Sequence, residues 1–362
     1  TMELKSIAED NDFYDAIRDL RNYEEKRSRL FVPGLFNVAA DQGEYRYAAV
    51  GAPQRLYMPW RNAPEQYAVE DNEPKQAIRA MCNHETLLNL LKNYVFHERQ
   101  PGGDARIIPR YMQYYAVEEI FDLIRTTDHK RGLIWHTQGS GKSFTMLFAA
   151  RNLIQGATLG DRAPVLDNPQ VLVVVDTDDL ESQMENQLNA LNFDRFDVAR
   201  SGAHLQRLLE EGRSTLVLTT IQKFGNVDSD VQGNDETVIM SDEAHRYMEK
   251  DLGTKLNAAL PDAYHFGFTG TPVRDGDRDT FRNYEIPDSE DPYLHRYSIK
   301  DGIDDGLILP VHFDIHEIEW DIDRAGLNQA FDAEFDHLDL DEKRELIQEY
   351  VTQTEIAELR SR

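Results

Sequence analysis

The chain has 362 residues, of which 66 are Asp or Glu and 39 are Lys or Arg, so its formal net charge is −27. A hydrophobic fraction of 40% argues against wholesale disorder, and the length predicts roughly two domains. The single cysteine, Cys82, excludes an intramolecular disulfide framework and a cysteine-based zinc site. No apolar run approaches the roughly 18 to 20 residues that cross a bilayer, so we expect a cytoplasmic protein without a membrane partner.

The acidic residues are spread along the whole chain instead of forming one tail. In molar salt the Debye length falls to about 3 Å, which screens the self-repulsion of such a surface. The composition therefore predicts a halophilic source. The same charge would ordinarily argue against a nucleic-acid partner.

Mixed α and β elements are predicted over residues 1–60. Apolar side chains at helical spacing, Tyr23 among them, predict a helix over about residues 12–27. Short strands are expected at about residues 35–39 and 45–50, joined by a turn at Asp41-Gln42-Gly43.

Residues 61–104 are interpreted as a connecting helix and linker. The helix is expected from about Pro74 to Tyr94, and the polar residues 97–104 are the best candidate for a domain boundary. Cys82 lies within this helix and is interpreted as a buried structural residue, because no catalytic pattern surrounds it.

From about residue 105, apolar runs that end in polar residues alternate with helical segments. The runs lie at residues 132–136, 171–175, 215–218, 237–240 and 264–268. Fully apolar strands separated by helices are typical of a parallel sheet covered on both faces. The sequence therefore predicts an α/β nucleotide-binding layout, followed by a possible strand at 311–320 and an acidic, helix-prone tail.

The sharpest local pattern is Gly139-Ser140-Gly141-Lys142-Ser143, between the strand at 132–136 and a helix predicted at 143–154. Backbone N–H groups of such a loop, with Thr137 at its start, surround phosphates. Lys142 reaches the β and γ oxygens, and Ser143 can bind Mg²⁺. His136 occupies the consensus first-glycine position. A glycine-rich helix start is also common as bare structure, but the strand-loop-helix context favours nucleotide binding.

The second half of an ATPase site is predicted at Asp242-Glu243-Ala244-His245, after the strand at 237–240. Asp242 would hold Mg²⁺, and Glu243 would orient and deprotonate the attacking water. Such a tetrapeptide alone could be a solvated loop. Its place at the carboxyl end of a buried strand favours the ATPase interpretation.

Weaker patterns are consistent with the same site. Gln113 precedes the loop and could read adenine with both ends of its amide. The hydroxyls of Thr269 and Thr271 could sense the γ-phosphate through His245. Three residues at another strand end are candidates for contacts to a phosphodiester backbone, namely Thr219, Thr220 and Lys223. Taken singly, Gln113 is better explained as an ordinary residue of a helix surface, the pattern at Thr269 and Thr271 as a turn, and the pattern from Thr219 to Lys223 as a strand end.

Together these segments resemble the motor subunit of type I restriction endonucleases, a superfamily 2 DNA translocase. The phrases that carry the resemblance occur in the family's order: RYMQYYAV, GLIWHTQGSGKSFTM, LVVVDTDDLESQ, LTTIQKF, VIMSDEAHRYM, FGFTGTPV and YSIKDGIDDGLILPV. The resemblance implies a first RecA-like motor domain over residues 105–315, with residues 316–362 leading toward a second. It implies ATP and Mg²⁺ as cofactors. It also implies double-stranded DNA and the methylation and specificity subunits as partners.

The resemblance extends to residues 1–60, which would be the C-terminal part of a PD-(D/E)xK-type α/β nuclease domain. Met2-Glu3-Leu4-Lys5-Ser6 resembles its ExK strand, in which Glu3 would hold Mg²⁺ and Lys5 would position the attacking water. The next helix resembles the family's helix, with Asp19 where many members have Gln. The upstream Asp of that nuclease would lie before Thr1.

The resemblance implies that the chain is a fragment of a type I site-specific deoxyribonuclease. The second motor domain would supply an arginine finger, which contributes about 10³ to 10⁵ in rate in related phosphoryl transfer. We therefore expect the fragment to bind ATP, to hydrolyse it very weakly, and to bind DNA poorly. Two alternatives stay open: another superfamily 2 helicase or restriction protein, and a non-catalytic nucleotide-binding interaction module.

Overall fold

The computed structural model describes residues 1–5, 12–61, 73–99, 104–156, 164–231, 233–244, 251–272, 274–275, 278–279, 284, 291–310 and 333. Residues 1–310 form one compact unit and residues 311–362 another. The strand predicted at 311–320 lies outside the described residues, as does the acidic tail apart from residue 333. Within the described part of the chain, no helix is both long enough and apolar enough to cross a membrane.

A seven-stranded parallel sheet organises residues 104–310, here called the sheet region, and its strand order is β14-β6-β11-β10-β7-β9-β8. The strands are β6 (Arg131–His136), β7 (Gln170–Val175), β8 (Phe196–Val198), β9 (Leu216–Thr220), β10 (Thr237–Asp242), β11 (Tyr264–Thr269) and β14 (His295–Tyr297). The predicted parallel α/β sheet is confirmed. The short edge strands β8 and β14 were not predicted.

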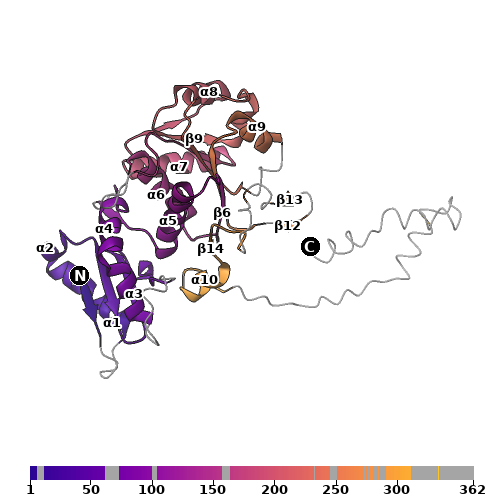
Figure 1. Ribbon diagram of the computed structural model, residues 1–362. Helices are drawn as coiled ribbons and strands as arrows, with labels where there is room; N and C mark the ends of the chain where they lie inside the picture. Colours follow the sequence, from indigo (N-terminus) through magenta and orange to yellow (C-terminus); the bar gives the residue numbers. More distant parts are fainter. Residues whose placement is uncertain are drawn as a thin grey trace. The chain divides into compact units, whose positions relative to one another are not determined.

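Helices cover both faces of this sheet (Figure 1). One face packs on α5 (Tyr111–Thr126), α6 (Lys142–Ile154) and α7 (Asp178–Ala190), and the other packs on α8 (Gly202–Glu211) and α9 (Asp251–Ala259). In β7, Val171, Val173 and Val175 join the first core, whereas Leu172 and Val174 join the second. Because the central strands are buried on both faces, their middle residues are mostly apolar.

Residues 1–61, here called the N-terminal module, contain a smaller sheet of β1 (Met2–Leu4), β2 (Phe36–Ala40) and β3 (Tyr45–Ala49). β1 is parallel to β2, and β2 is antiparallel to β3. At the predicted turn, Asp41 Oδ1 accepts hydrogen bonds of 2.7 Å from the N–H groups of both Gly43 and Glu44. The side chain thereby holds the turn that the sequence predicted.

One face of the small sheet packs on α1 (Phe13–Lys26), which is followed by the short α2 (Ser28–Phe31). α1 starts at a capping box formed by Asp12 and Asp15, and it buries Ala16, Ile17 and Leu20. The predicted helix is confirmed to within one residue at each end. Tyr23 does not join its buried face, however, because its side chain is 45% exposed.

The other face of the small sheet is continuous with the main core. The ring centroids of Tyr47 and Trp60 lie 5.5 Å apart, and the same distance separates Trp60 from Tyr114 of α5. The Tyr47 hydroxyl also donates a 2.8 Å hydrogen bond to the carbonyl of Pro109. Aromatic packing therefore joins the N-terminal module directly to the helix that precedes the glycine-rich loop.

The single helix predicted from Pro74 to Tyr94 is instead two helices, α3 (Glu73–Cys82) and α4 (His84–Asn93). Asn83 separates them and caps α4, because its side-chain oxygen accepts hydrogen bonds from the next N–H groups. Cys82 is half-buried, so it is less enclosed than predicted, and burial raises the pKa of its thiol. An antiparallel pair follows, β4 (Phe96–Glu98) with β5 (Ala105–Ile107).

Candidate active site

The glycine-rich loop, residues 137–141, joins β6 to α6 at the carboxyl edge of the sheet. Gly139 and Gly141 have φ angles of +81° and +90°, which side chains other than glycine rarely tolerate. A Cβ at Gly141 would also lie 2.6 Å from Gln113 Nε2, whereas one at Gly139 would meet open space. Ser140 closes the turn by donating its hydroxyl to the carbonyl of Thr137 at 2.6 Å.

The first turn of α6 is arranged to receive an anion. Gly141 stands at the N-cap position and supplies no side-chain cap, so the first N–H groups of the helix carry its partial positive charge. Lys142 and the half-buried Ser143 occupy this same turn. The loop therefore fits a phosphate chain with its metal ion, through backbone donors, one ammonium group and one hydroxyl.

The acidic pair follows β10 and faces the loop. Lys142 Nζ lies 3.3 Å from Glu243 Oε1, although the two residues are far apart in the sequence. Asp242 ends β10 with 9% of its surface exposed, and its Oδ1 accepts a 3.1 Å hydrogen bond from the Glu243 N–H group. Glu243 has a φ of +48°, a strained value that clusters at functional sites when it occurs outside glycine. The sheet thus brings the lysine and both carboxylates to one edge.

The end of β11 lies at the same edge of the sheet, between the ends of β6 and β10. Thr269 is fully buried, and its hydroxyl oxygen accepts a 3.1 Å hydrogen bond from the N–H group of the exposed Thr271. A Cβ at Gly270 would lie only 3.2 Å from Lys142 Nζ, so the turn passes close to the lysine. His245 lies outside the described residues, and its coupling role stays a prediction.

Gln113 clamps the loop through its amide. Its Nε2 donates to the carbonyl of Gly141 at 3.0 Å, and its Oε1 accepts from the N–H group of Arg110 at 2.8 Å. Arg110 in turn donates to the carbonyl of Ser140 at 3.0 Å. The amide predicted to read adenine therefore also positions the loop. Sequence reasoning missed Arg110, although its spacing of three residues from Gln113 is that of a helix cap.

A buried histidine pair lies directly under the loop. His136 Nε2 and His295 Nδ1 are 2.8 Å apart, and both rings are enclosed. Burial lowers the pKa of His136 well below its usual value and that of His295 to about 4, because enclosure disfavours the charged imidazole. Both rings are neutral at pH 7. No sequence pattern links these residues, since β14 pairs with β6 only in the folded sheet.

Asp305 is a second buried group that sequence reasoning missed. It follows α10 (Ile299–Asp304), has 2% of its surface exposed, and accepts hydrogen bonds of 2.9 Å at Oδ2 from the hydroxyls of Tyr111 and Tyr297. Arg61 Nε lies 2.9 Å from its Oδ1, and Arg46 donates to its carbonyl at 3.0 Å. Burial raises the pKa of this carboxyl group. The residue joins the N-terminal module to α5 and β14.

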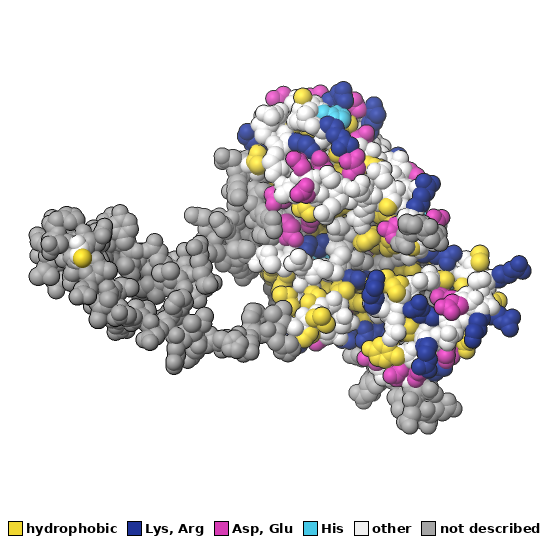
Figure 2. Space-filling model, turned by 180° about the vertical axis from the view of Figure 1, so that it is seen from behind, with side chains coloured by type: hydrophobic (Ala, Val, Ile, Leu, Met, Phe, Trp, Pro, Cys, Tyr) yellow, Lys and Arg dark blue, Asp and Glu magenta, His cyan; other side chains and the backbone are white. Residues whose placement is uncertain are grey.

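The predicted DNA contacts lie at the end of β9. Thr219 and Thr220 have buried side chains, and Lys223 lies in the 3-10 helix η4 (Ile221–Asn226). Lys223 Nζ is 2.5 Å from Glu181 Oε1, with side chains only 13% and 10% exposed. A phosphate would therefore have to compete with Glu181 for this lysine. On the visible face in Figure 2, basic and acidic side chains are interspersed over the described surface.

The predicted nuclease residues meet in the N-terminal module. Lys5 Nζ lies 2.5 Å from Asp19 Oδ2 and 3.3 Å from Glu3 Oε1. The hydrogen bond to Asp19 is the main cause that raises the pKa of Lys5. Asp19 thus contacts the lysine directly. Among the described residues, no cluster of three or more metal-ligating side chains is present.

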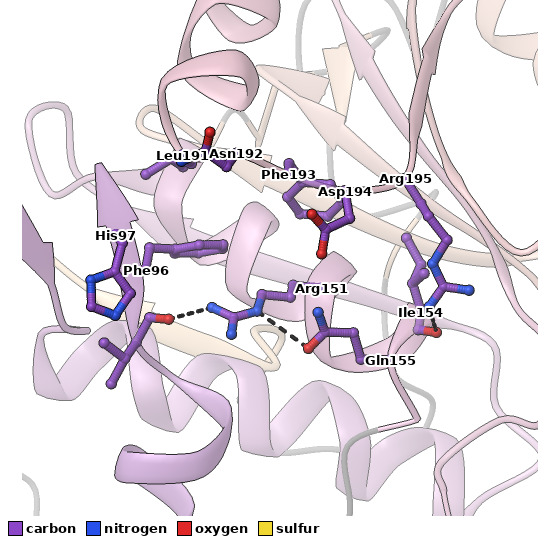
Figure 3. Close-up of a pocket in the computed structure, with 11 residues that line it drawn as sticks. Phe96, His97, Arg151, Ile154, Gln155, Leu191, Asn192, Phe193, Asp194 and Arg195 are labelled. Carbon is purple, nitrogen blue, oxygen red and sulfur yellow. Dashed lines mark hydrogen bonds between the residues drawn. The ribbon is translucent and has the colours of Figure 1, made fainter. Parts of the chain in front are cut away.

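A cavity of about 220 Å³ lies at the opposite end of α6 from the glycine-rich loop (Figure 3). Arg151 donates to the carbonyl of Val95 and to Gln155 Oε1, and it stacks 4.7 Å from the ring centre of Phe96. Arg195 donates to the carbonyl of Ile154 at 2.8 Å. Both arginines bind the protein's own backbone: Arg151 joins α6 to the start of β4, and Arg195 joins the start of β8 to the end of α6.

Residues 112–344 match the SWI2/SNF2 ATPase family. A protein named as a type I restriction enzyme MjaVIIIP endonuclease subunit, from Methanocaldococcus jannaschii, is 30% identical over 346 residues, which cover 85% of this chain and 32% of that protein. The HindI endonuclease subunit of Haemophilus influenzae, also type I, is 29% identical over 344 residues, covering 86% of this chain and 31% of that protein.

The chain therefore spans about a third of the length of these curated relatives. Among solved structures, a fragment named as an HsdR subunit of a type I restriction enzyme from Vibrio vulnificus is 20% identical. It covers 82% of this chain and 47% of that chain, with a TM-score of 0.36.

Proposed function

Since the chain belongs to the SWI2/SNF2 ATPase family and its curated homologues are endonuclease subunits of type I restriction enzymes, we propose that it is the ATP-binding motor portion of such a subunit. In the full cytoplasmic complex it would contribute to ATP-dependent translocation along double-stranded DNA, coupled to cleavage. The methylation and specificity subunits would be its partners there.

One observation carries the proposal. The glycine-rich loop, the Lys142 ammonium group and the Asp242-Glu243 pair share the carboxyl edge of one parallel sheet, with 3.3 Å between Lys142 Nζ and Glu243 Oε1. Ligands of open α/β sheets bind at this edge. A lysine that touches the catalytic-base candidate also places that carboxylate within reach of the γ-phosphate position.

The residues have separate roles in the proposed reaction. Loop N–H groups and Lys142 would hold the phosphates, while Ser143 and Asp242 would provide oxygen ligands for Mg²⁺. The bound ion would offset negative charge on the β and γ oxygens. Lys142 would exchange Glu243 for the γ-phosphate, which frees the carboxylate to orient a water molecule and accept its proton.

The remaining predicted residues belong to the same proposal. Thr269, Thr271 and His245 would couple the γ-phosphate to motion, and DNA would contact Thr219, Thr220 and Lys223. Glu3 and Lys5 would belong to the nuclease, which the meeting of Lys5 with Glu3 and Asp19 supports.

The substitution Glu243→Gln tests the motor assignment. It removes the proton acceptor but keeps the shape, so ATP affinity measured by calorimetry should stay near that of the wild-type chain. Single-turnover release of phosphate should fall by about 10²-fold or more, the usual contribution of a general base. Lys142→Ala should instead lose ATP binding, because it removes the ammonium group from the phosphate loop.

The matched control is Glu210→Gln, which makes the same change on the exposed face of α8. Its binding and turnover should equal those of the wild-type chain. Equal hydrolysis by wild type and Glu243→Gln, at a rate above that of ATP without protein, would reject the motor and favour the non-catalytic nucleotide-binding module.

A further inference from the structure

A large cavity opens beside the glycine-rich loop. Its volume is about 790 Å³, and Gly139, Gly141 and Gln113 form part of its lining. This volume falls within the range of about 300 to 1,000 Å³ that small-molecule sites occupy. Phosphates on the loop would therefore lie at the cavity's border, and the rest of a nucleotide would have room within it.

The N-terminal module supplies another wall of the same cavity. Residues 47–53 contribute to it, as do Leu56 and Met58, with Leu56 at the end of the 3-10 helix η2 (Gln54–Leu56). Leu56 is 44% exposed and lines the cavity, so part of its apolar side chain is open to a ligand there. Gly51 has a φ of +86°, and a Cβ there would meet no atom within 4 Å, so the turn borders open space.

Hydrogen bonds and an ion pair within the protein hold this wall in place. Arg106 donates to the carbonyls of Gly34 and Val32 at 2.8 and 2.9 Å, which ties β5 to the N-terminal module. Arg61 contacts Asp305 as described above, and Tyr47 hydrogen-bonds to Pro109. Because these bonds need no ligand, the wall is preorganised beside the loop.

The lining chemistry suits a nucleoside. Ile107, Ile108 and Phe144 provide apolar surface, on which the faces of a base can pack. Arg110 and Gln113 bring polar groups to the cavity from the start of α5. A planar base with a hydrogen-bonding edge requires this combination of apolar walls and a few directed polar groups.

We propose that the base and ribose of ATP bind in this cavity, and that the N-terminal module forms one wall of the nucleotide site. The loop holds the phosphates, and Leu56 packs against the nucleoside. ATP binding consequently depends on the N-terminal module as well as on the sheet region. This inference rests on the proposed ATP site.

The test compares Leu56→Glu with Leu30→Glu, the same change at a 71% exposed leucine of the N-terminal module that does not line the cavity. Calorimetry measures two probes, Mg-ATP and inorganic tripolyphosphate. Leu56→Glu should weaken Mg-ATP binding about tenfold or more, which is about 1.4 kcal/mol. Tripolyphosphate binding should stay unchanged, because it needs the loop alone. Leu30→Glu should bind both probes like the wild-type chain.

Photolabelling the wild-type chain with 8-azido-ATP gives a measurement that needs no variant. Peptide mapping should find label within residues 47–58 or 104–113. Unchanged Mg-ATP affinity in Leu56→Glu, or label confined to other peptides, would overturn the inference while leaving the phosphate loop assigned. If the wild-type chain binds neither probe, the proposed function itself fails, and the inference fails with it.

Discussion

Burial sets the charge of individual side chains around the glycine-rich loop. His136 and His295 are enclosed side by side and are kept neutral, since burial lowers the pKa of each. Two charged rings 2.8 Å apart would repel each other as well as lose their hydration. The position that holds glycine in the consensus loop therefore carries an imidazole that is tolerated only in its neutral form.

This pair makes stability depend on pH. An unfolded histidine titrates near 6.5, whereas the pKa of folded His295 is about 4. Between these values the unfolded state binds more protons, so the free energy of unfolding falls as the pH falls from 6.5 toward 4. Between pH 7.5 and 5, His295 should contribute a loss of about 2 kcal/mol. Urea unfolding should show a shallower pH dependence in His295→Gln.

The exposed His97 provides the control for this measurement. His97→Gln should keep the full pH dependence of the wild-type chain. An identical slope in His295→Gln and wild type would show that His295 is not held neutral by the fold.

At the scale of elements, Asp305 connects structures that are remote in sequence. Its carboxylate accepts from Tyr111 of α5 and Tyr297 of β14, and it is paired with Arg61 of the N-terminal module. The carbonyl of Tyr297 also accepts a 3.0 Å hydrogen bond from the N–H group of Thr137, the first residue of the glycine-rich loop. One buried side chain thus links the N-terminal module to the strand that supports the loop.

Asp305→Ala should lower the free energy of unfolding by about 1 to 3 kcal/mol, the usual cost of leaving buried hydrogen-bonding groups without a partner, because Arg61 is 35% exposed and can regain water. The two tyrosine hydroxyls would lose their acceptor, which adds to the penalty. The neighbouring Asp304 has an exposed side chain, so Asp304→Ala should change stability by no more than about 0.5 kcal/mol. Equal stability of the two variants, measured by denaturant unfolding, would contradict the role of Asp305.

The whole molecule carries a net charge of −27, which disfavours a compact state at low ionic strength. Acidic and basic side chains are mixed on the face seen in Figure 2, so repulsion there is spread over the surface. The net negative charge is compatible with a proposed DNA-handling function on two conditions. A few side chains and backbone N–H groups must contact the DNA phosphates, and salt must screen the repulsion between DNA and the other acidic side chains. We therefore retain high salt as the proposed working environment.

This proposal predicts that salt stabilises the chain. Raising KCl from 0.1 to 1 M shortens the Debye length from about 10 to about 3 Å, so self-repulsion weakens and the thermal midpoint should rise steadily. NaCl should act like KCl, because screening depends on ionic strength and not on the identity of the cation. A midpoint that is constant or falls over this range would argue against adaptation to salt.

The sequence by itself determined the local units. Period and composition located the five longer strands of the parallel sheet, because strands buried on both faces are mostly apolar, but not the short edge strands β8 and β14. The glycine-rich pattern between β6 and α6 could also be recognised from the sequence. Gly139 and Gly141 have positive φ angles, and this conformation depends on the residue type at each position, not on distant contacts. The break between α3 and α4 was missed because the Asn83 cap was overlooked in an otherwise helical segment.

Only the tertiary structure decided which of these units meet. The motifs predicted that Lys142 and Glu243 share a site, but their direct contact follows from the order of strands in the sheet, which hydrophobic periodicity does not encode. The pairings of Lys223 with Glu181, and of Asp305 with Arg61, depend equally on packing between remote segments. Residue types thus indicate which chemistry is possible, whereas long-range packing decides which groups are neutral, paired or close enough to act.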